Sequence, residues 1–321
     1  MTSRLFAASL LIVAACSGPA DAPQQTAGAQ AGAGQGWSIS VSGDLNDFFD
    51  CLEAQGAALV SAHRGGPRPG YPENAKETFA KTVSDIPAIL EIDVATSADG
   101  VLYLMHDDDL ARTTTGSGPA DGLSWSEIKD LRLEDENGKA TDFTPPTLAE
   151  TLAWANGRTV VQIDFKKTTR YEDVIAEVNR QGANDRVIYI AYTMAQAERL
   201  HRLAPDAMIS LSLGSQSDLN RAVAAGVPAD RLLGFTGIDD PRPRLFSLLN
   251  NRDVEVIFGT LGGRQSIDND IAQSGDEAFY ATLAGMGVDI IATDRPLAAQ
   301  AALDAAGRGA KSGQCGVART G

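Results

Sequence analysis

The stretch Ile89–Met105, ILEIDVATSADGVLYLM, holds two short apolar runs separated by a turn. Ala98-Asp99-Gly100 is a turn signal, so the stretch is predicted to form a β-hairpin. If the chain reverses at this turn, residues that face each other have numbers that sum to about 198. Glu91 and Asp93 then lie beside the strand end that leads into His106. The hairpin therefore predicts two carboxylates and a histidine in one small volume.

Outward from the hairpin, short apolar runs alternate with amphipathic stretches over most of the chain. The strand-like runs are Ala58–Ala62, Ile89–Val94, Val101–Met105, Thr159–Phe165, Val187–Ala191, Met208–Leu213, Leu232–Phe235, Val254–Phe258 and Val288–Ala292. Helical patterns between them include Tyr171–Gln181, Met194–Leu203, Ser217–Ala225, Pro243–Asn251 and Glu277–Met286. This alternation predicts an α/β protein with a parallel sheet and covering helices. The nine runs are one more than a TIM (β/α)8 barrel uses. The ninth run is explained if the second arm of the hairpin extends beyond the barrel rim.

Further features of the sequence limit which folds and which binding partners are possible. Residues 107–146 break the alternation and are predicted to be an insertion at the C-terminal face of the barrel. The sequence has no Gly-x-Gly-x-x-Gly after the first strand, which argues against a nucleotide-binding fold. The 321 residues carry a net charge of −15, whereas a nucleic-acid partner requires a basic surface. The same charge disfavours adhesion to anionic lipid.

The N-terminus has the pattern of an export signal. Arg4 precedes an apolar run that is too short to span a bilayer and that ends in Val13-Ala14-Ala15-Cys16. We therefore predict a signal peptide over residues 1–16 with lipidation of Cys16; ordinary cleavage, for instance after Ala22, is the alternative. A flexible linker over 17–36, a barrel domain over 37–305 and a C-terminal tail over 306–321 follow. The expected location is the periplasm, with membrane contact only through the lipid anchor and no protein partner implied.

Two further cysteines lie at opposite ends of the predicted barrel domain. Cys51 precedes the first core strand and Cys315 follows the last helix. In a closed barrel these two ends of the chain fall near one another, on the face opposite the predicted site. Export implies an oxidising compartment, so a disulfide between them is one interpretation and two unpaired thiols are the other.

Charged residues gather at the ends of the strand-like runs, where barrel enzymes carry their active sites. Glu91, Asp93 and Asp164 offer hard oxygen ligands for Ca²⁺ or Mg²⁺. Arg64 and Lys166 supply positive charge for a phosphoryl group. His63 and His106 can then act as general acid and general base. Together these residue types predict hydrolysis of a phosphodiester.

The order of these motifs resembles the glycerophosphodiester phosphodiesterase family from about residue 58 to about residue 300. The motifs are His63-Arg64-Gly65, Pro72-Glu73-Asn74, Glu91-x-Asp93, Asp99-Gly100, His106-Asp107, Arg112-Thr113-Thr114, Pro146-Thr147-Leu148, Asp164-x-Lys166 and Val288–Pro296. The resemblance implies a TIM-type barrel and divalent-metal-dependent hydrolysis of glycerophosphodiesters to an alcohol and sn-glycerol 3-phosphate. It also implies catalytic roles for His63 and His106 and ligand roles for Glu91 and Asp93. Asp164 departs from the family, which usually carries Glu at this position.

Other interpretations of the same residues stay open. The acidic residues could form structural ion pairs with Arg64 and Lys166 without a metal. Glu73 is either a supporting site residue or a helix N-terminal residue, and Asp107 is expected to orient neighbouring groups. A lysophospholipase D or sphingomyelinase-like activity on the same barrel is a second hypothesis. A non-catalytic binding lipoprotein is a third.

Overall fold

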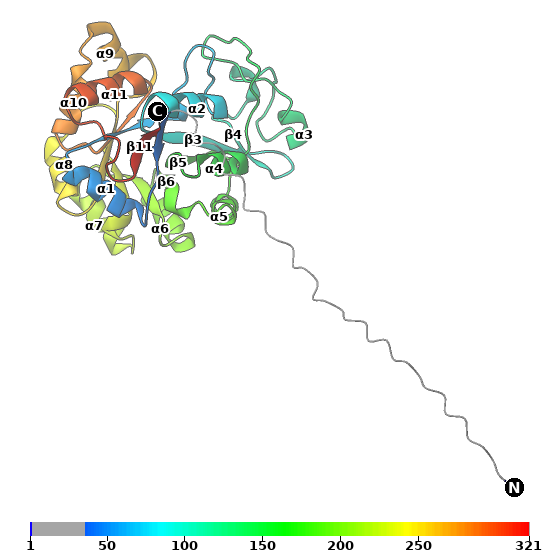
Figure 1. The fold of residues 1–321 in the computed structure, drawn as a ribbon, viewed down its shortest axis with the longest axis horizontal. Coiled ribbons are helices and arrows are strands. Elements are labelled where there is room, and N and C mark those ends of the chain that lie inside the picture. Colours follow the sequence, from blue (N-terminus) through cyan, green and yellow to red (C-terminus); the bar gives the residue numbers. More distant parts are fainter. Residues whose placement is uncertain (2–35, 321) are drawn as a thin grey trace. The chain divides into compact units, whose positions relative to one another are not determined.

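The computed structural model describes Met1 and residues 36–320, and Figure 1 shows the fold of this part. Cys16, the rest of the predicted signal peptide after Met1, and the predicted linker up to residue 35 lie outside the described residues. Within the described part, no helix combines the length and apolar character needed to cross a membrane.

Eight parallel strands close into a barrel. The hydrogen-bonded order is β2, β10, β9, β8, β7, β6, β5, β3, and pairing of β2 with β3 closes the ring. The closing pair β2–β3 is parallel, and so is every other pair of neighbouring strands in the barrel. The strands are β2 (Leu59–Ala62), β3 (Ala88–Thr96), β5 (Val161–Phe165), β6 (Val187–Ala191), β7 (Met208–Ser212), β8 (Leu232–Phe235), β9 (Glu255–Gly259) and β10 (Ile290–Thr293). The predicted TIM-type architecture is confirmed.

Helices surround the barrel (Figure 1) and connect consecutive strands. They are α1 (Leu45–Ala54), α2 (Lys76–Asp85), α3 (Trp125–Ile128), α4 (Leu148–Ala155), α5 (Tyr171–Arg180), α6 (Met194–Leu203), α7 (Gln216–Ala224), α8 (Pro243–Asn250), α9 (Ile267–Ser274), α10 (Ala278–Gly285) and α11 (Pro296–Ala305). The five helices predicted from their amphipathic pattern are confirmed to within one residue at each end.

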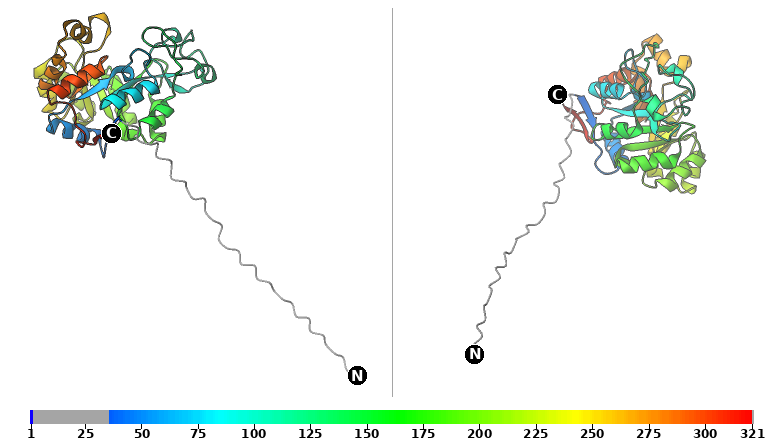
Figure 2. Two further views of the ribbon diagram at one scale, coloured as in Figure 1. Left: turned by 45° about the horizontal axis from the view of Figure 1, so that its top comes forward. Right: turned by 90° about the vertical axis from the view of Figure 1, so that its right-hand side faces the viewer.

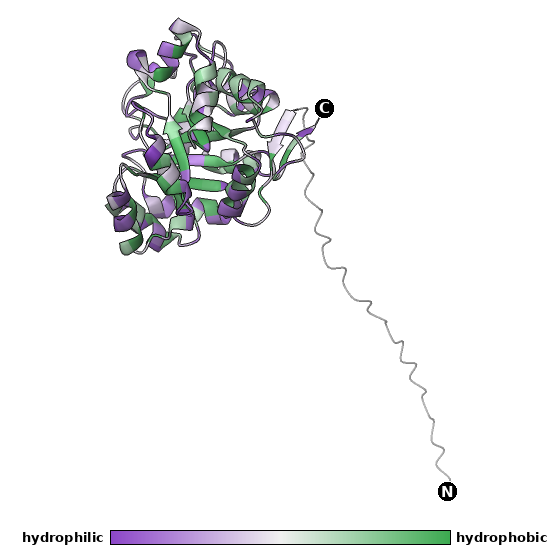
Figure 3. Ribbon diagram, turned by 90° about the vertical axis from the view of Figure 1, so that its left-hand side faces the viewer, coloured by the Kyte–Doolittle hydropathy of each residue, from purple (hydrophilic) through white to green (hydrophobic). Residues whose placement is uncertain are grey.

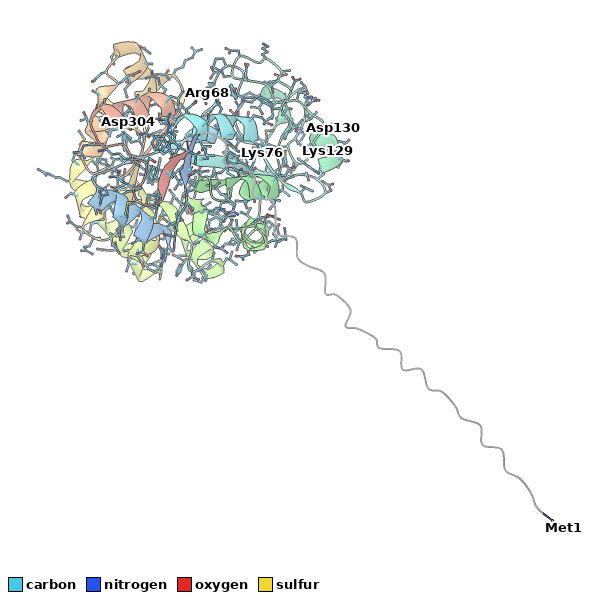
Figure 4. All side chains as sticks on the ribbon, in the orientation of Figure 1. Met1, Arg68, Lys76, Lys129, Asp130 and Asp304 are labelled. Carbon is cyan, nitrogen blue, oxygen red and sulfur yellow. A yellow bond between two sulfur atoms is a disulfide. The ribbon has the colours of Figure 1, made fainter. Side chains whose placement is uncertain are left out.

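The predicted hairpin is present with the predicted register. β4 (Leu102–Leu104) pairs antiparallel with the second half of β3, and Val94 faces Leu104. The amide of Met105 then donates to the carbonyl of Asp93 at 3.0 Å. The segment that follows forms the predicted insertion with a small apolar cluster of its own around Tyr103 and Leu110. Exposed Lys129, just after α3, lies on the outer side of this insertion (Figure 4).

Side chains alternate between the outside and the inside of the barrel. Outward residues such as Val60, Leu90 and Ile163 pack against the helices in the main apolar cluster. The lower part of the barrel interior is also apolar, and α1 closes it from below with side chains that include Phe48. The strands are accordingly green over most of their length in Figure 3, which colours residues by hydropathy. Polar inward residues are therefore exceptional: most occur in the upper half of the barrel, and Glu255 at the start of β9 lies near its bottom.

Two short strands and a disulfide join the ends of the described chain. β1 (Gly36–Ile39) pairs antiparallel with β11 (Val317–Thr320), and Figure 2 shows the pair at the margin of the barrel. Cys51 in α1 is joined to Cys315 by a disulfide that closes 264 residues of sequence. Residues 306–321, predicted as a C-terminal tail, thus supply the strand β11 and the disulfide partner Cys315. Gly36, predicted as the last residue of the linker, belongs to β1.

Buried carboxyl groups near the bottom of the barrel predict a pH-dependent stability. Burial and the nearby Asp289 raise the pKa of Glu255 from 4.5 to about 9, and burial raises the pKa of Asp289 to about 7. A raised carboxyl pKa in the folded state stabilises the protein below the unfolded pKa, and this stability is lost as the pH rises through the folded pKa. We expect the free energy of unfolding to fall by about 1 kcal/mol or more between about pH 5 and pH 9. Urea denaturation across this range measures the change.

The matched variant for this prediction is Glu255→Gln, which keeps the shape of the side chain and removes its charge. Its free energy of unfolding should depend less on pH than that of the wild-type chain. Equal pH dependence in the two proteins would show that Glu255 ionises normally in the folded state.

Candidate active site

The loop after β2 requires its glycines. His63–Gly65 form a short 3₁₀ turn in which Arg64 has a φ of 50° and Gly65 a φ of 84°. A Cβ on Gly65 would lie 2.2 Å from the ring of Phe79, so the sequence after Arg64 must be glycine here. This turn directs the backbone N–H of Arg64 at Glu91, where it donates to Oε2 at 2.7 Å. The loop thus connects the first histidine to the first candidate metal ligand.

His63 is held by a carboxylate from the other end of the chain. Its Nδ1 lies 2.6 Å from Oδ1 of Asp294. Burial alone would lower the pKa of His63, but the hydrogen bond to Asp294 and the charge of Glu91 raise it above its ordinary value. Because Nδ1 is engaged by Asp294, Nε2 is the ring nitrogen left for proton transfer.

Asp294 is itself positioned by a buried residue of α9. Asp268 accepts a hydrogen bond from the backbone N–H of Asp294 at 2.7 Å and one from the hydroxyl of Tyr280 at 2.6 Å. The hydroxyl of Thr293 donates to the same carboxylate. Three donors on one buried carboxylate fix the backbone that carries Asp294, and this arrangement in turn fixes the ring of His63.

The three predicted metal ligands lie together at the top of the barrel. Glu91, Asp93 and Asp164 are buried, and one carboxylate oxygen from each lies within 4.8 Å of the others. Burial and the neighbouring Asp93 raise the pKa of Glu91, as expected for carboxylates that share a site. Oδ1 of Asp164 is buried and has no hydrogen-bond partner among the described residues. Buried carboxylates with a free oxygen fit a hard divalent cation such as Mg²⁺ or Ca²⁺.

Two other residues orient this carboxylate group. Asn74, at a φ of 57°, accepts from the backbone N–H of Asp93 and donates to its Oδ2 at 2.7 Å. The ammonium of Lys166 lies 2.7 Å from both Asp93 Oδ1 and Asp164 Oδ2. Burial opposes the charged form of Asp93, but the charges of Lys166, His106 and Arg64 together outweigh it and lower the pKa of that carboxyl. Lys166 therefore touches the ligand group directly, and one donor of its ammonium is left for a ligand in the cavity that it lines.

His106 is held by a second chain of ion pairs. Its Nδ1 lies 2.6 Å from Oδ1 of Asp107. Arg112 binds both oxygens of Asp107 and both oxygens of Glu73, and Glu73 also accepts from Arg64 at 3.0 Å. The Arg112 hydrogen bonds hold the pKa of Asp107 well below its usual range. Glu73 precedes α2 and joins the charged network, so the site interpretation of this residue fits the structure better than the helix-terminus one.

A cavity of about 220 Å³ opens between the two histidines. One wall consists of charged residues and histidines: His63 just after β2, Glu91 and Asp93 on β3, Asp164 on β5, Lys166 just after β5, and His106. The opposite wall is mainly apolar and comes from β6, β8, β9 and β10 and from the loops after β6 and β9, with Tyr192 exposed at the mouth. Its members are Ile190, Ala191, Tyr192, Phe235, Ile257, Leu261 and Ala292.

Six of the seven predicted catalytic, phosphate-binding and ligand residues line this cavity. The seventh, Arg64, does not line it; its guanidinium pairs with Glu73 and lies 3.7 Å from Asp93 Oδ2. Sequence reasoning assigned no site role to Asp294, Asp268, Asn74 or Arg112. Asp294 is 231 residues from the histidine that it holds, so spacing carried no signal for the pair. Its only signal was the motif Thr293-Asp294-Arg295-Pro296 after the last strand.

Comparison with known proteins places this site in a family. Residues 63–298 match the model of the glycerophosphoryl diester phosphodiesterase family. A crystal structure of a glycerophosphoryl diester phosphodiesterase from Parabacteroides distasonis is 27% identical, with a TM-score of 0.80 over 89% of this chain and 100% of that one. An Oleispira antarctica phosphodiesterase solved with the product sn-glycerol-3-phosphate shares the fold at 20% identity and a TM-score of 0.62, covering 77% of this chain and 97% of that one.

Among curated proteins, glycerophosphodiester phosphodiesterase GDPD4 of Arabidopsis thaliana is 31% identical over 160 residues, which are 47% of this chain and 48% of that protein. The alignments with the relatives in Bacillus subtilis, Arabidopsis thaliana and Mycobacterium tuberculosis span 63%, 48% and 53% of those proteins, less than two thirds in each case. The family model, by contrast, covers well over half of this chain. The chain belongs to the glycerophosphoryl diester phosphodiesterase family.

Proposed function

We propose that this protein hydrolyses glycerophosphodiesters to an alcohol and sn-glycerol 3-phosphate, with a divalent metal and two histidines. The observation that carries the proposal is the joint geometry of the cavity. Two histidines, each with a carboxylate 2.6 Å from Nδ1, line a cavity that also contains three buried carboxylates. Acid–base pairs beside a cluster of hard oxygen ligands suit cleavage of a P–O bond.

Glu91, Asp93 and Asp164 are the residues that would hold the metal. A bound Mg²⁺ or Ca²⁺ would neutralise charge on the phosphoryl oxygens. Arg64 and Lys166 bring further positive charge to an otherwise acidic protein. Asp294 and Asp107 fix the two imidazoles with Nε2 free, so one ring can accept a proton from the nucleophile and the other can donate one to the departing oxygen.

Export of the protein belongs to the same proposal. The disulfide between Cys51 and Cys315 supports an oxidising compartment, because such bonds are rare in reducing cytoplasm. We propose a periplasmic location after removal of the signal peptide, with anchoring through a lipid on Cys16. Radiolabelled palmitate incorporated into the wild-type chain but not into Cys16→Ser would support the anchor, and equal labelling of both would exclude it.

Removal of one ligand tests the metal site. Asp164→Ala should raise the metal concentration needed for half-maximal hydrolysis of glycerophosphocholine by at least the 10- to 100-fold typical for loss of a residue that supports a metal site. Choline release, titrated against Mg²⁺ and Ca²⁺ and in the presence of chelator, measures it. Asp206→Ala, an exposed aspartate after α6, is the matched control.

Two outcomes would contradict the proposal. An unchanged metal titration in Asp164→Ala would remove this residue from the ligand set. Full activity of the wild-type chain after exhaustive chelation would remove the metal from the reaction.

A further inference from the structure

Below the charged residues, the cavity has a floor made of three uncharged polar side chains. Ser61, Gln162 and Ser210 line the cavity and are 0%, 4% and 2% exposed. They come from β2, β5 and β7, strands that also carry site residues or line the mouth. Buried strands rarely place hydroxyl and amide groups inward without a partner for them.

The depth of this floor follows from strand geometry. Gln162 precedes Asp164 by two residues on β5, and Ser61 lies on β2, two residues before His63, which begins the turn after that strand. Residues two apart on a strand point the same way and are separated by about 6.6 Å. The floor therefore lies one layer beneath the histidine and the candidate metal ligands. Apolar residues such as Leu59, Val160 and Met208 form the layer below it.

The floor has hydrogen-bonding capacity that the protein does not use. The hydroxyl of Ser61 donates to Oε1 of Gln162 at 3.1 Å. Among the described residues, the amide nitrogen of Gln162 and the hydroxyl of Ser210 have no partner, and neither atom is closed off from the cavity. Two free groups inside a cavity require partners from a ligand or from water.

The chemistry of the floor selects the kind of group that fits it. Hydroxyl and amide groups both donate and accept, and they carry no charge. They therefore match the hydroxyl groups of a neutral polyol. The opposite wall, which includes Ile190, Phe235 and Leu261, offers apolar surface instead. The two ends of a phosphodiester thus meet different surroundings in this cavity.

We propose that Ser61, Gln162 and Ser210 form a subsite that hydrogen-bonds the hydroxyl groups of the polyol esterified to phosphorus. The polyol enters the barrel first, the phosphorus lies at the level of the histidines, and the departing alcohol faces the mouth near Tyr192. This orientation rests on the proposed phosphodiesterase function, because it takes the charged layer as the place of the phosphoryl group. It makes the polyol, and not the departing alcohol, the part of the substrate that the protein selects.

Calorimetric binding of two small phosphates to the full chain with Mg²⁺ tests the subsite without turnover. sn-Glycerol 3-phosphate and propyl phosphate have the same carbon chain and differ in two hydroxyl groups. The wild-type chain should bind sn-glycerol 3-phosphate at least about tenfold more tightly, the discrimination expected from two satisfied hydrogen bonds. Ser210→Ala should reduce this affinity about threefold to tenfold and leave the affinity for propyl phosphate unchanged or higher.

A second variant and a control make the test specific to the floor. Gln162→Met keeps the length of the side chain and should produce a loss similar to that of Ser210→Ala. Combining the two changes should remove the discrimination. Ser217→Ala makes the same chemical change as Ser210→Ala at an exposed position of α7, and its affinities should equal those of the wild-type chain.

The results separate this inference from the proposed function. Equal binding of the two phosphates by the wild-type chain, or an equal loss of both in the variants, would overturn the polyol subsite even if glycerophosphocholine is hydrolysed. Selective binding that depends on Ser210 would support the subsite, and it would do so even if the protein failed to hydrolyse glycerophosphocholine, in which case the proposed reaction alone would be wrong.

Discussion

Replacing His63 or His106 by alanine is expected to lower the turnover of glycerophosphodiesters by about 10²- to 10⁴-fold, the usual contribution of a positioned acid or base. Each imidazole lines the cavity and is held at Nδ1 by its own carboxylate. Alanine removes the proton-transfer group and leaves the carboxylates of the metal site in place. The loss should therefore appear mainly in kcat.

The third histidine of the chain provides the matched control. His201 lies on α6, outside the cavity lining, so His201→Ala should retain the turnover of the wild-type chain. Circular dichroism and thermal unfolding would show whether each variant is folded. Near-normal turnover in folded His63→Ala or His106→Ala would show that the acid–base assignment of that residue is incorrect.

Loss of the disulfide is expected to have the largest effect on stability. A cross-link restricts the unfolded chain more when it closes a longer loop, and Cys51–Cys315 closes 264 residues. The chain-entropy model gives about 5 kcal/mol for a loop of this size, the upper end of the range found for native disulfides. Cys51→Ser combined with Cys315→Ser should lower the free energy of unfolding by about this amount.

Comparison of the double variant with the oxidised and reduced wild-type chain in urea measures this effect. The reduced wild-type chain should match the variant, since both lack the cross-link. Activity should be retained under folding conditions, because the disulfide joins α1 to the C-terminal segment and neither cysteine lines the cavity. Equal midpoints for oxidised and reduced protein would mean that the bond does not restrict the unfolded chain measurably.

The barrel and the ligand group could be predicted because their signals are local. Each barrel strand is a short apolar run between turn signals, and the hairpin register followed from the position of its turn. Glu91 and Asp93, or Asp164 and Lys166, share a strand face because residues two apart point the same way. Charged residues two positions apart on one face of a buried strand therefore indicated the site before the order and pairing of the strands were known.

The parts that could not be predicted depend on contacts between distant segments. β1 and β11 are four residues long. Trp37 and Ile39 alternate with Ser38, as in a half-buried strand, but so short a run does not reveal which strand it pairs with. Their pairing becomes visible only when the barrel brings both chain ends together. The ion pair of Arg112 with Glu73 could not be predicted because the two residues are 39 positions apart in the sequence. The floor residues Ser61 and Ser210 looked like ordinary strand residues, since a single serine in an apolar run carries no functional signal.

The most direct test of the proposed function is ³¹P NMR of glycerophosphocholine incubated with the mature protein, with Mg²⁺ or Ca²⁺ and with chelator. The proposed function predicts that phosphorus appears as sn-glycerol 3-phosphate, that free choline is released, and that chelator stops the reaction. Phosphocholine as the phosphorus product would contradict the proposed bond cleavage. An unchanged substrate signal with folded protein and either metal would contradict the proposed activity itself.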